Sequence, residues 1–189
     1  MATGRLRKLS EQANRRLAIR YRAFLLSPEP DHRPARKEAI MGHWAMAKSH
    51  PGGEEINPAL MARRDFPYPH STPGAIAIKA FAAQLPEREG EYLEAVERTH
   101  LVECLNIDDA DVLVAAAERL GAEPAIMREV MADPEVEKRV WADHVEAVNA
   151  GIQSTPTVDF SGKYRITGAQ PTEVFKKTFE RALADPADA

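Results

Sequence analysis

The chain has 189 residues, of which 44% are hydrophobic and 29% charged, with a formal net charge of −4. These values are typical of one globular domain with an inserted lobe, or of two small lobes, and they exclude a disordered chain. There is no apolar run of membrane-span length and no signal-peptide apolar core, and the single cysteine, Cys104, excludes an internal disulfide and an all-cysteine metal site. We therefore expect a cytoplasmic protein without a membrane partner.

The first predicted element is a helix over residues 3–16. Residues 1–37 hold ten Lys and Arg against three acidic residues, so basic charge is concentrated at this end of the chain. A basic segment can attract nucleic acid. However, Leu6, Leu9, Ala13 and Leu17 recur at helical spacing, which indicates that the basic side chains form the solvated face of an amphipathic helix. Because no recognition motif accompanies them, we predict no nucleic-acid partner.

The later elements predict a sheet built from both ends of the chain. Residues 17–26 are expected to form a strand, since alternate residues along it are apolar. Helices are expected over residues 35–49, 73–84, 87–104, 111–120 and 134–149 and from Pro171 onward, with strands over 157–160 and 164–167. This order predicts an α/β layered domain from residues 1–72 and 151–189, with residues 73–150 inserted as a helical domain.

The two C-terminal strands form the most informative part of the sequence. Pro156 stands at the entry of the first strand, where its missing N–H is tolerated, and Gly162 gives the backbone freedom that a tight hairpin needs. The stretch "GIQSTPTVDFSGKYRITGAQPTEVF" resembles the C-terminal half of the DsbA-like thioredoxin-fold dithiol oxidoreductases, especially their FrnE-like branch. The resemblance to this family extends to "RLAIRYRAFLLSPEP" and to the helices predicted over residues 73–150, so it covers most of the chain.

The resemblance implies a thioredoxin-like fold with an inserted helical domain and a substrate site at Thr155 and Pro156. Pro156 corresponds to the family's cis-proline, so we predict a cis bond after Thr155. Such a bond would turn the Thr155 backbone outward, toward an extended peptide or thiol substrate that pairs as an added strand. The loop "FPYPHSTPG" is expected to line the same cleft with Phe66 and Tyr68.

One departure from the family decides the expected activity. The family carries Cys-x-x-Cys between its first strand and first helix, and this chain begins at "MATGRLRKL", where that helix is already under way. The resemblance therefore implies that the first strand is missing, either because the start is assigned too late or cut off, or because the protein is a remnant. As written, the chain cannot perform dithiol exchange. We expect a sheet of about three strands and a tendency to form a homodimer through exposed strand edges.

Two other functions stay open beside an oxidoreductase lineage. One is a non-catalytic peptide-binding or chaperone-like thioredoxin-fold module. The other is a relative of 2-hydroxychromene-2-carboxylate isomerase and the kappa-type glutathione transferases, although "ITGAQP" resembles the oxidoreductase branch more closely. The catalytic residues are unknown on any of these readings, and no cofactor is implied.

The remaining candidate residues favour structural roles. Cys104 is expected to lie on a helix as an inert, buried hydrophobic residue, with His100 one turn away. The six histidines lack short metal-ligand spacing, so no metal is predicted and surface or capping roles are expected for each. The acidic pairs Glu54–Glu55 and Asp108–Asp109 are explained by loop solvation and helix capping.

Overall fold

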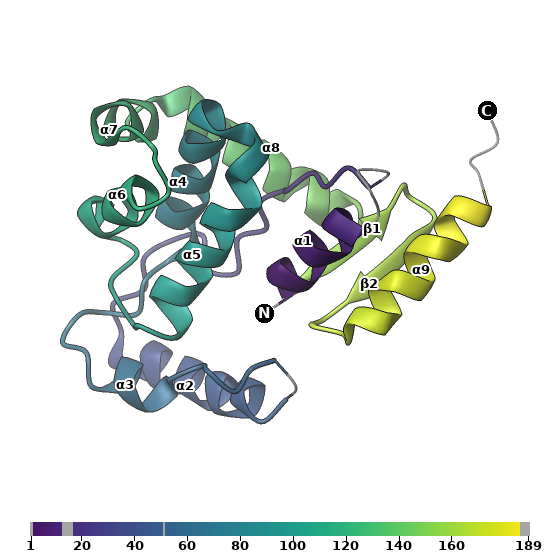
Figure 1. Ribbon diagram of the computed structural model, residues 1–189. Coiled ribbons are helices and arrows are strands. Elements are labelled where there is room, and N and C mark those ends of the chain that lie inside the picture. The colour runs from purple at the N-terminus through teal and green to yellow at the C-terminus, as the bar shows by residue number, and fades with distance from the viewer. Residues whose placement is uncertain (1, 13–16, 51, 186–189) are drawn as a thin grey trace.

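The protein is a helix-rich α/β fold with a small two-stranded sheet. The computed structural model describes residues 2–12, 17–50 and 52–185. In chain order the elements are α1 (Ala2–Gln12), α2 (Pro34–Lys48), α3 (Pro58–Ala62), α4 (Ser71–Gln84), η1 (Pro86–Arg88), α5 (Glu89–Leu101), α6 (Ala110–Glu118), α7 (Pro124–Met131), α8 (Pro134–Asn149), β1 (Thr157–Phe160), β2 (Tyr164–Thr167) and α9 (Thr172–Ala184). Figure 1 shows the helical block, made of α4 to α8, on one side of the molecule, with the β1–β2 hairpin, α1 and α9 on the other.

Most of the predicted helices are present, and two short ones were not predicted. α3 begins at Pro58, where Asn57 accepts a hydrogen bond from the Leu60 N–H, and no helix is predicted there. α7 begins at Pro124, within a stretch to which no helix had been assigned. In the predicted helix 3–16, residues 13–16 lie outside the described part of the chain. Among the described helices, none is long and apolar enough to cross a membrane.

The helical block has a core of its own. The rings of Phe81 in α4 and Tyr92 in α5 stack with their centroids 4.5 Å apart, and both side chains are fully buried. The Tyr92 hydroxyl donates to the Leu113 carbonyl in α6, which satisfies the one polar atom that this burial would leave unpaired. Met127 of α7 closes the same cluster. Because α4 to α7 bury these side chains against one another, the block forms one packed unit.

One face of the hairpin packs against two helices that lie far apart in the sequence. β1 pairs antiparallel with β2, so that Thr157 lies opposite Thr167 and Phe160 opposite Tyr164. Both Ser161 and Gly162 at the turn have positive φ angles. The buried face of the hairpin meets α1 and α9 in a cluster made of Leu6, Leu9, Phe160, Ile166, Phe175 and Phe179. This cluster connects the two ends of the chain.

The predicted strand over residues 17–26 is wrong, as is the predicted sheet of about three strands. The segment is extended and its exposure alternates along most of its length, but it belongs to no strand. Side chains take the place of a neighbouring strand on its backbone. Lys79 donates to the Tyr21 carbonyl, while Asp143 and His144 of α8 accept from the N–H groups of Ala23 and Leu25. The alternation of apolar residues therefore shows which side of the segment is buried, although residues 17–26 form no β-ladder with another strand.

Asp143 is the centre of this attachment. Its carboxylate, 7% exposed, lies 2.7 Å from Lys79 Nζ and 3.0 Å from Arg22 Nη1, and it accepts the Ala23 N–H at 3.1 Å. A buried carboxylate is stable only when charges and hydrogen bonds compensate it, and all three groups do so here. The ion pairs connect α8, α4 and the extended segment.

We expect Asp143→Asn to lower the free energy of unfolding by roughly 3 kcal/mol, because removing one partner leaves the charge of Lys79 buried without compensation. Urea unfolding followed by circular dichroism would measure the change. Asp111→Asn is the matched control: its ion pair with Arg128 is exposed, so we expect a loss of at most about 1 kcal/mol. Equal losses in the two variants would contradict the role assigned to Asp143.

Candidate functional site

The Thr155–Pro156 pair lies in the loop that enters β1. α8 ends at Asn149, and the chain turns at Gly151, whose φ of +74° favours glycine. The Thr155–Pro156 peptide bond is cis, the geometry that the family resemblance implied. Gly168 N donates to the Pro156 carbonyl at 2.8 Å, which ties the loop to the end of β2. Thr155 itself is exposed, and within the described part of the chain its backbone N–H and C=O have no hydrogen-bond partner.

The first turn of α1 is held beside this loop. Arg5 Nη1 donates to the carbonyls of Ala169 and Gln170, at 3.0 and 2.6 Å. These residues follow Gly168, which bonds Pro156, so the start of α1 lies next to the end of the hairpin. The solvated basic face predicted for this helix is therefore only partly correct. Arg7 also has partners, since it lies 3.1 Å from Glu94 of α5 and 2.9 Å from Glu11.

A carboxyl group lies beneath the same turn of α1. Thr3 Oγ1 donates to Glu97 Oε1 at 3.0 Å, and Glu97 Oε2 is buried with no partner among the described residues. Burial raises the pKa of Glu97 to about 7, although the hydrogen bond from Thr3 acts in the opposite direction. Glu97 can therefore gain or lose a proton near neutral pH. No local pattern in the sequence marks Glu97, because its partner Thr3 lies more than ninety residues away along the chain.

Cys104 does not lie on a helix, so that prediction is corrected. α5 ends at Leu101, and Cys104 follows in a loop with a φ of +53°. The helix stops because the chain turns here, and Arg64 holds the turn by donating to the carbonyls of Glu103 and Cys104. The thiol is fully buried and donates to the Asn57 carbonyl at 3.3 Å. Burial raises the pKa of Cys104, which disfavours the reactive thiolate and supports the inert reading.

His100 belongs to an aromatic cluster, so the surface or capping role expected for it is wrong. Its Nε2 lies 3.0 Å from the Tyr68 hydroxyl, and its ring is perpendicular to Trp44 with the centroids 5.0 Å apart. Burial lowers the pKa of His100 to about 4, so the imidazole is neutral at neutral pH. A neutral imidazole that contacts Tyr68 does not stabilise the Cys104 thiolate.

The acidic pairs have the structural roles that were expected. Glu54 accepts the Gly52 N–H inside its own loop, and Asp109 caps α6 by accepting from Asp111 N. Asp108 accepts the His70 N–H at the start of α4. No group of three or more His, Cys, Asp or Glu that could hold a metal ion occurs in the described part of the chain.

Tyr68 lines a cavity of about 480 Å³, and neither Thr155 nor Pro156 is among its lining residues. The lining comes from Leu26 to Asp31, from Arg33 and Arg36, and from Tyr68 to His70. Phe66 is not among these lining residues, and Lys37 Nζ lies 5.4 Å from its ring centroid. This cavity therefore does not bring Phe66 and Tyr68 together with Pro156.

Solved structures from three bacteria share this fold. A candidate protein disulfide isomerase from Nitrosomonas europaea superposes with a TM-score of 0.79 at 18% identity, over 96% of this chain and 89% of that one. A candidate DsbA oxidoreductase from Streptomyces coelicolor gives 0.68 at 22% identity, over 100% and 86%. The cytosolic disulfide reductase DsbM from Pseudomonas aeruginosa, solved with glutathione, gives 0.66 at 18% identity, over 95% and 93%.

The fold and the proline loop thus define a protein of the thioredoxin-like class. The model of the DSBA-like thioredoxin domain matches residues 1–180, and the chain belongs to this family of thiol oxidoreductases. No curated protein matched the chain.

We expect Glu97 to make stability depend on pH. Its pKa is raised in the folded protein, so the folded state binds the proton more tightly, and its contribution to stability is lost as pH rises from about 4.5 to about 7. The free energy of unfolding should fall by roughly 2 kcal/mol across this range in the wild type relative to Glu97→Gln. Urea unfolding of both proteins at the two ends of the range would measure it, and parallel curves would contradict the assignment.

Proposed function

We propose that the chain is a DsbA-like protein of the thiol:disulfide oxidoreductase lineage, in its FrnE-like branch. It binds a thiol or peptide substrate at Thr155 and Pro156 and does not itself complete dithiol exchange. The observation that carries the proposal is the exposed Thr155 backbone, whose N–H and C=O lack partners among the described residues. An exposed backbone with free hydrogen-bonding groups is a site at which an extended peptide can pair as an added strand.

The edge of β1 supports the same mode of binding. In the part of the chain described, β1 pairs with β2 alone, so its other edge carries no neighbouring strand. Thr155 directly precedes Pro156 and the start of β1 at Thr157, so its backbone continues the line of that strand. A second copy of the chain could use the same edge to form a homodimer.

The chemistry of the single cysteine argues against turnover. Dithiol exchange needs an attacking thiolate and a second thiol that resolves the mixed disulfide. The chain holds one cysteine, and its thiol is buried with a raised pKa. We therefore propose a protein that descends from oxidoreductases but binds its substrate without turning it over. A non-catalytic peptide-binding or chaperone-like module would have the same binding function. The alternative of an isomerase or kappa-type transferase has no observation that favours it.

The small thiol that we propose as a substrate is of the glutathione type. DsbM, which shares the fold, was solved with glutathione and is cytosolic. Together with the single cysteine, this supports a cytoplasmic setting in which reduced thiols are abundant.

We expect this chain to show no insulin-reduction or dithiol-oxidase activity above background. Only Cys104 could attack, and its buried thiol has no resolving partner. Turbidity of reduced insulin and oxidation of a dithiol peptide would measure the two activities. Cys104→Ser should give the same baseline. Turnover in the wild type that is lost in this variant would show that Cys104 is a reactive site.

We expect an extended peptide to bind through its backbone at Thr155. In a strand, the N–H groups that point toward one edge belong to alternate residues. N-methylation at the alternate positions that face Thr155 should weaken binding of a short cysteine-containing peptide about tenfold, because it removes ladder hydrogen bonds. N-methylation at the intervening positions is the matched control and should have little effect. Fluorescence anisotropy would measure the affinities, and equal losses from the two sets would contradict strand pairing.

A further inference from the structure

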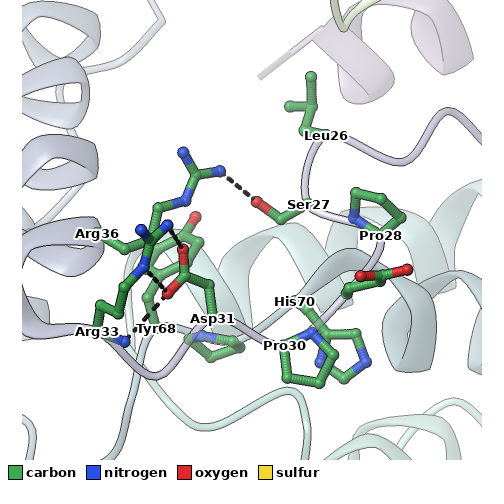
Figure 2. Close-up of a pocket in the computed structure, with 11 residues that line it drawn as sticks. Leu26, Ser27, Pro28, Pro30, Asp31, Arg33, Arg36, Tyr68 and His70 are labelled. Atoms are coloured by element: carbon green, nitrogen blue, oxygen red, sulfur yellow. Dashed lines mark hydrogen bonds and ion pairs between the residues drawn. The ribbon is translucent and has the colours of Figure 1, made fainter.

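The cavity beside α2 has the size of a ligand site and a rigid wall. Its volume of about 480 Å³ falls within the range of small-molecule pockets. Three prolines, Pro28, Pro30 and Pro69, line it, and proline fixes the backbone angle φ. Figure 2 shows the segment from Leu26 to Asp31 curving around the cavity, with Arg33 and Arg36 on one side and His70 on the other. Such a wall exists before a ligand arrives, which reduces the entropy lost on binding.

The two arginines of the cavity differ in what they bind. Arg33 forms a bidentate pair with Asp31, with its Nε and Nη2 donating at 2.8 and 2.6 Å, so a carboxylate of the protein already pairs with its charge. Among the described residues, the Arg36 side chain makes one hydrogen bond, from Nη2 to Ser27 Oγ at 2.7 Å. It forms no ion pair with any residue in the described part of the chain. Figure 2 shows its guanidinium directed toward Ser27, away from the Arg33–Asp31 pair.

This arrangement leaves a positioned cation with donors to spare. A guanidinium carries five N–H donors in a planar fork that matches a carboxylate. The Arg36 side chain is half-buried, and Ser27 fixes one end of the fork, so little side-chain entropy remains to be lost when an anion binds. His70 lies on the other side of the cavity from Arg36, with its Nδ1 2.9 Å from Asp108 Oδ1.

The rest of the lining restricts which anion fits. Asp31 offsets the charge of Arg33, and Glu29 adds a negative charge opposite in sign to Arg36, so the lining has no excess of positive charge. This disfavours a polyanion such as a nucleoside triphosphate. Glu29 is exposed and forms no ion pair among the described residues, so it can accept an ammonium group. Leu26 is 59% exposed, and the Tyr68 hydroxyl already faces His100, which leaves apolar surface on the lining. A zwitterionic peptide with a small apolar part meets all of these conditions.

We propose that the cavity lined by Ser27, Arg36 and Glu29 binds a short zwitterionic peptide thiol of the glutathione type, with a peptide carboxylate on Arg36 and the ammonium group on Glu29. This inference rests on the proposed function, which assigns a thiol substrate, and it adds a contact surface apart from Thr155 and Pro156. Arg36 acts here as a binding residue that selects for a carboxylate.

The test compares Arg36→Gln with Arg33→Gln, using glutathione as the probe and isothermal titration calorimetry as the measurement. Loss of a charge-assisted bidentate pair should weaken glutathione binding by roughly tenfold or more in Arg36→Gln. Arg33 lines the same cavity but is already paired with Asp31, so Arg33→Gln should bind within about twofold of the wild type. Glutathione diethyl ester, whose carboxylates are blocked, should bind the wild type as weakly as glutathione binds Arg36→Gln.

Three outcomes would overturn the inference. The first is wild-type affinity in Arg36→Gln, and the second is equal binding of glutathione and its diester. Absence of glutathione binding to the wild type would also overturn it, while leaving the pairing of an extended peptide at Thr155 to be decided by the N-methylated peptides. Conversely, Arg36-dependent binding of glutathione without any peptide pairing would sustain the cavity assignment and refute the proposed role of Thr155. Far-ultraviolet circular dichroism and urea unfolding of both variants would establish that each is folded.

Discussion

The buried carboxylate of Asp143 is the interaction on which the rest of the arrangement depends. In the part of the chain described, the extended segment before Leu26 has no strand beside it, so side chains must satisfy its backbone. Asp143 bonds the Ala23 N–H and is neutralised by Lys79 and Arg22, while His144 accepts from Leu25 N. Without these groups, buried N–H groups would be left without partners. The segment leads directly into the Leu26–Asp31 wall, so the helical block also fixes where that cavity lies.

The fold could be predicted from the sequence wherever local signals agree with tertiary contacts. Helix starts such as Asp133–Pro134 were found because the cap and the proline act locally, and the hairpin because Gly162 marks its turn. The strand over residues 17–26 failed for a different reason. Alternating burial is shared by a strand in a sheet and by an extended segment held by side chains. Only a partner strand distinguishes the two, and periodicity carries no information about partners.

The candidate site shows the same limit. Thr155 and Pro156 were identified because the proline loop has a family signature in contiguous residues. Arg5 and Glu97 were missed because their partners, Gln170 and Thr3, lie more than ninety residues away along the chain. In the sequence, such charged residues cannot be told apart from ordinary surface charges. Only their burial in the fold changes their chemical behaviour. Burial makes Glu97 a group that titrates near pH 7, whereas exposed carboxyls titrate several pH units lower.

The distribution of basic residues in the first part of the chain follows from these contacts. Arg5 binds backbone carbonyls, and Arg7, Arg22 and Arg33 each pair with a carboxylate, so much of the positive charge seen in the sequence is neutralised within the fold. A stripe that tracks a phosphate backbone requires consecutive unpaired cations, and these four are already engaged. Arg36 differs because, among the residues that the structure describes, its guanidinium bonds only a neutral hydroxyl. One such guanidinium beside the carboxylate of Glu29 suits a single carboxylate better than a polyanion, so the pairing of Arg33 with Asp31 contributes to the selectivity of the cavity.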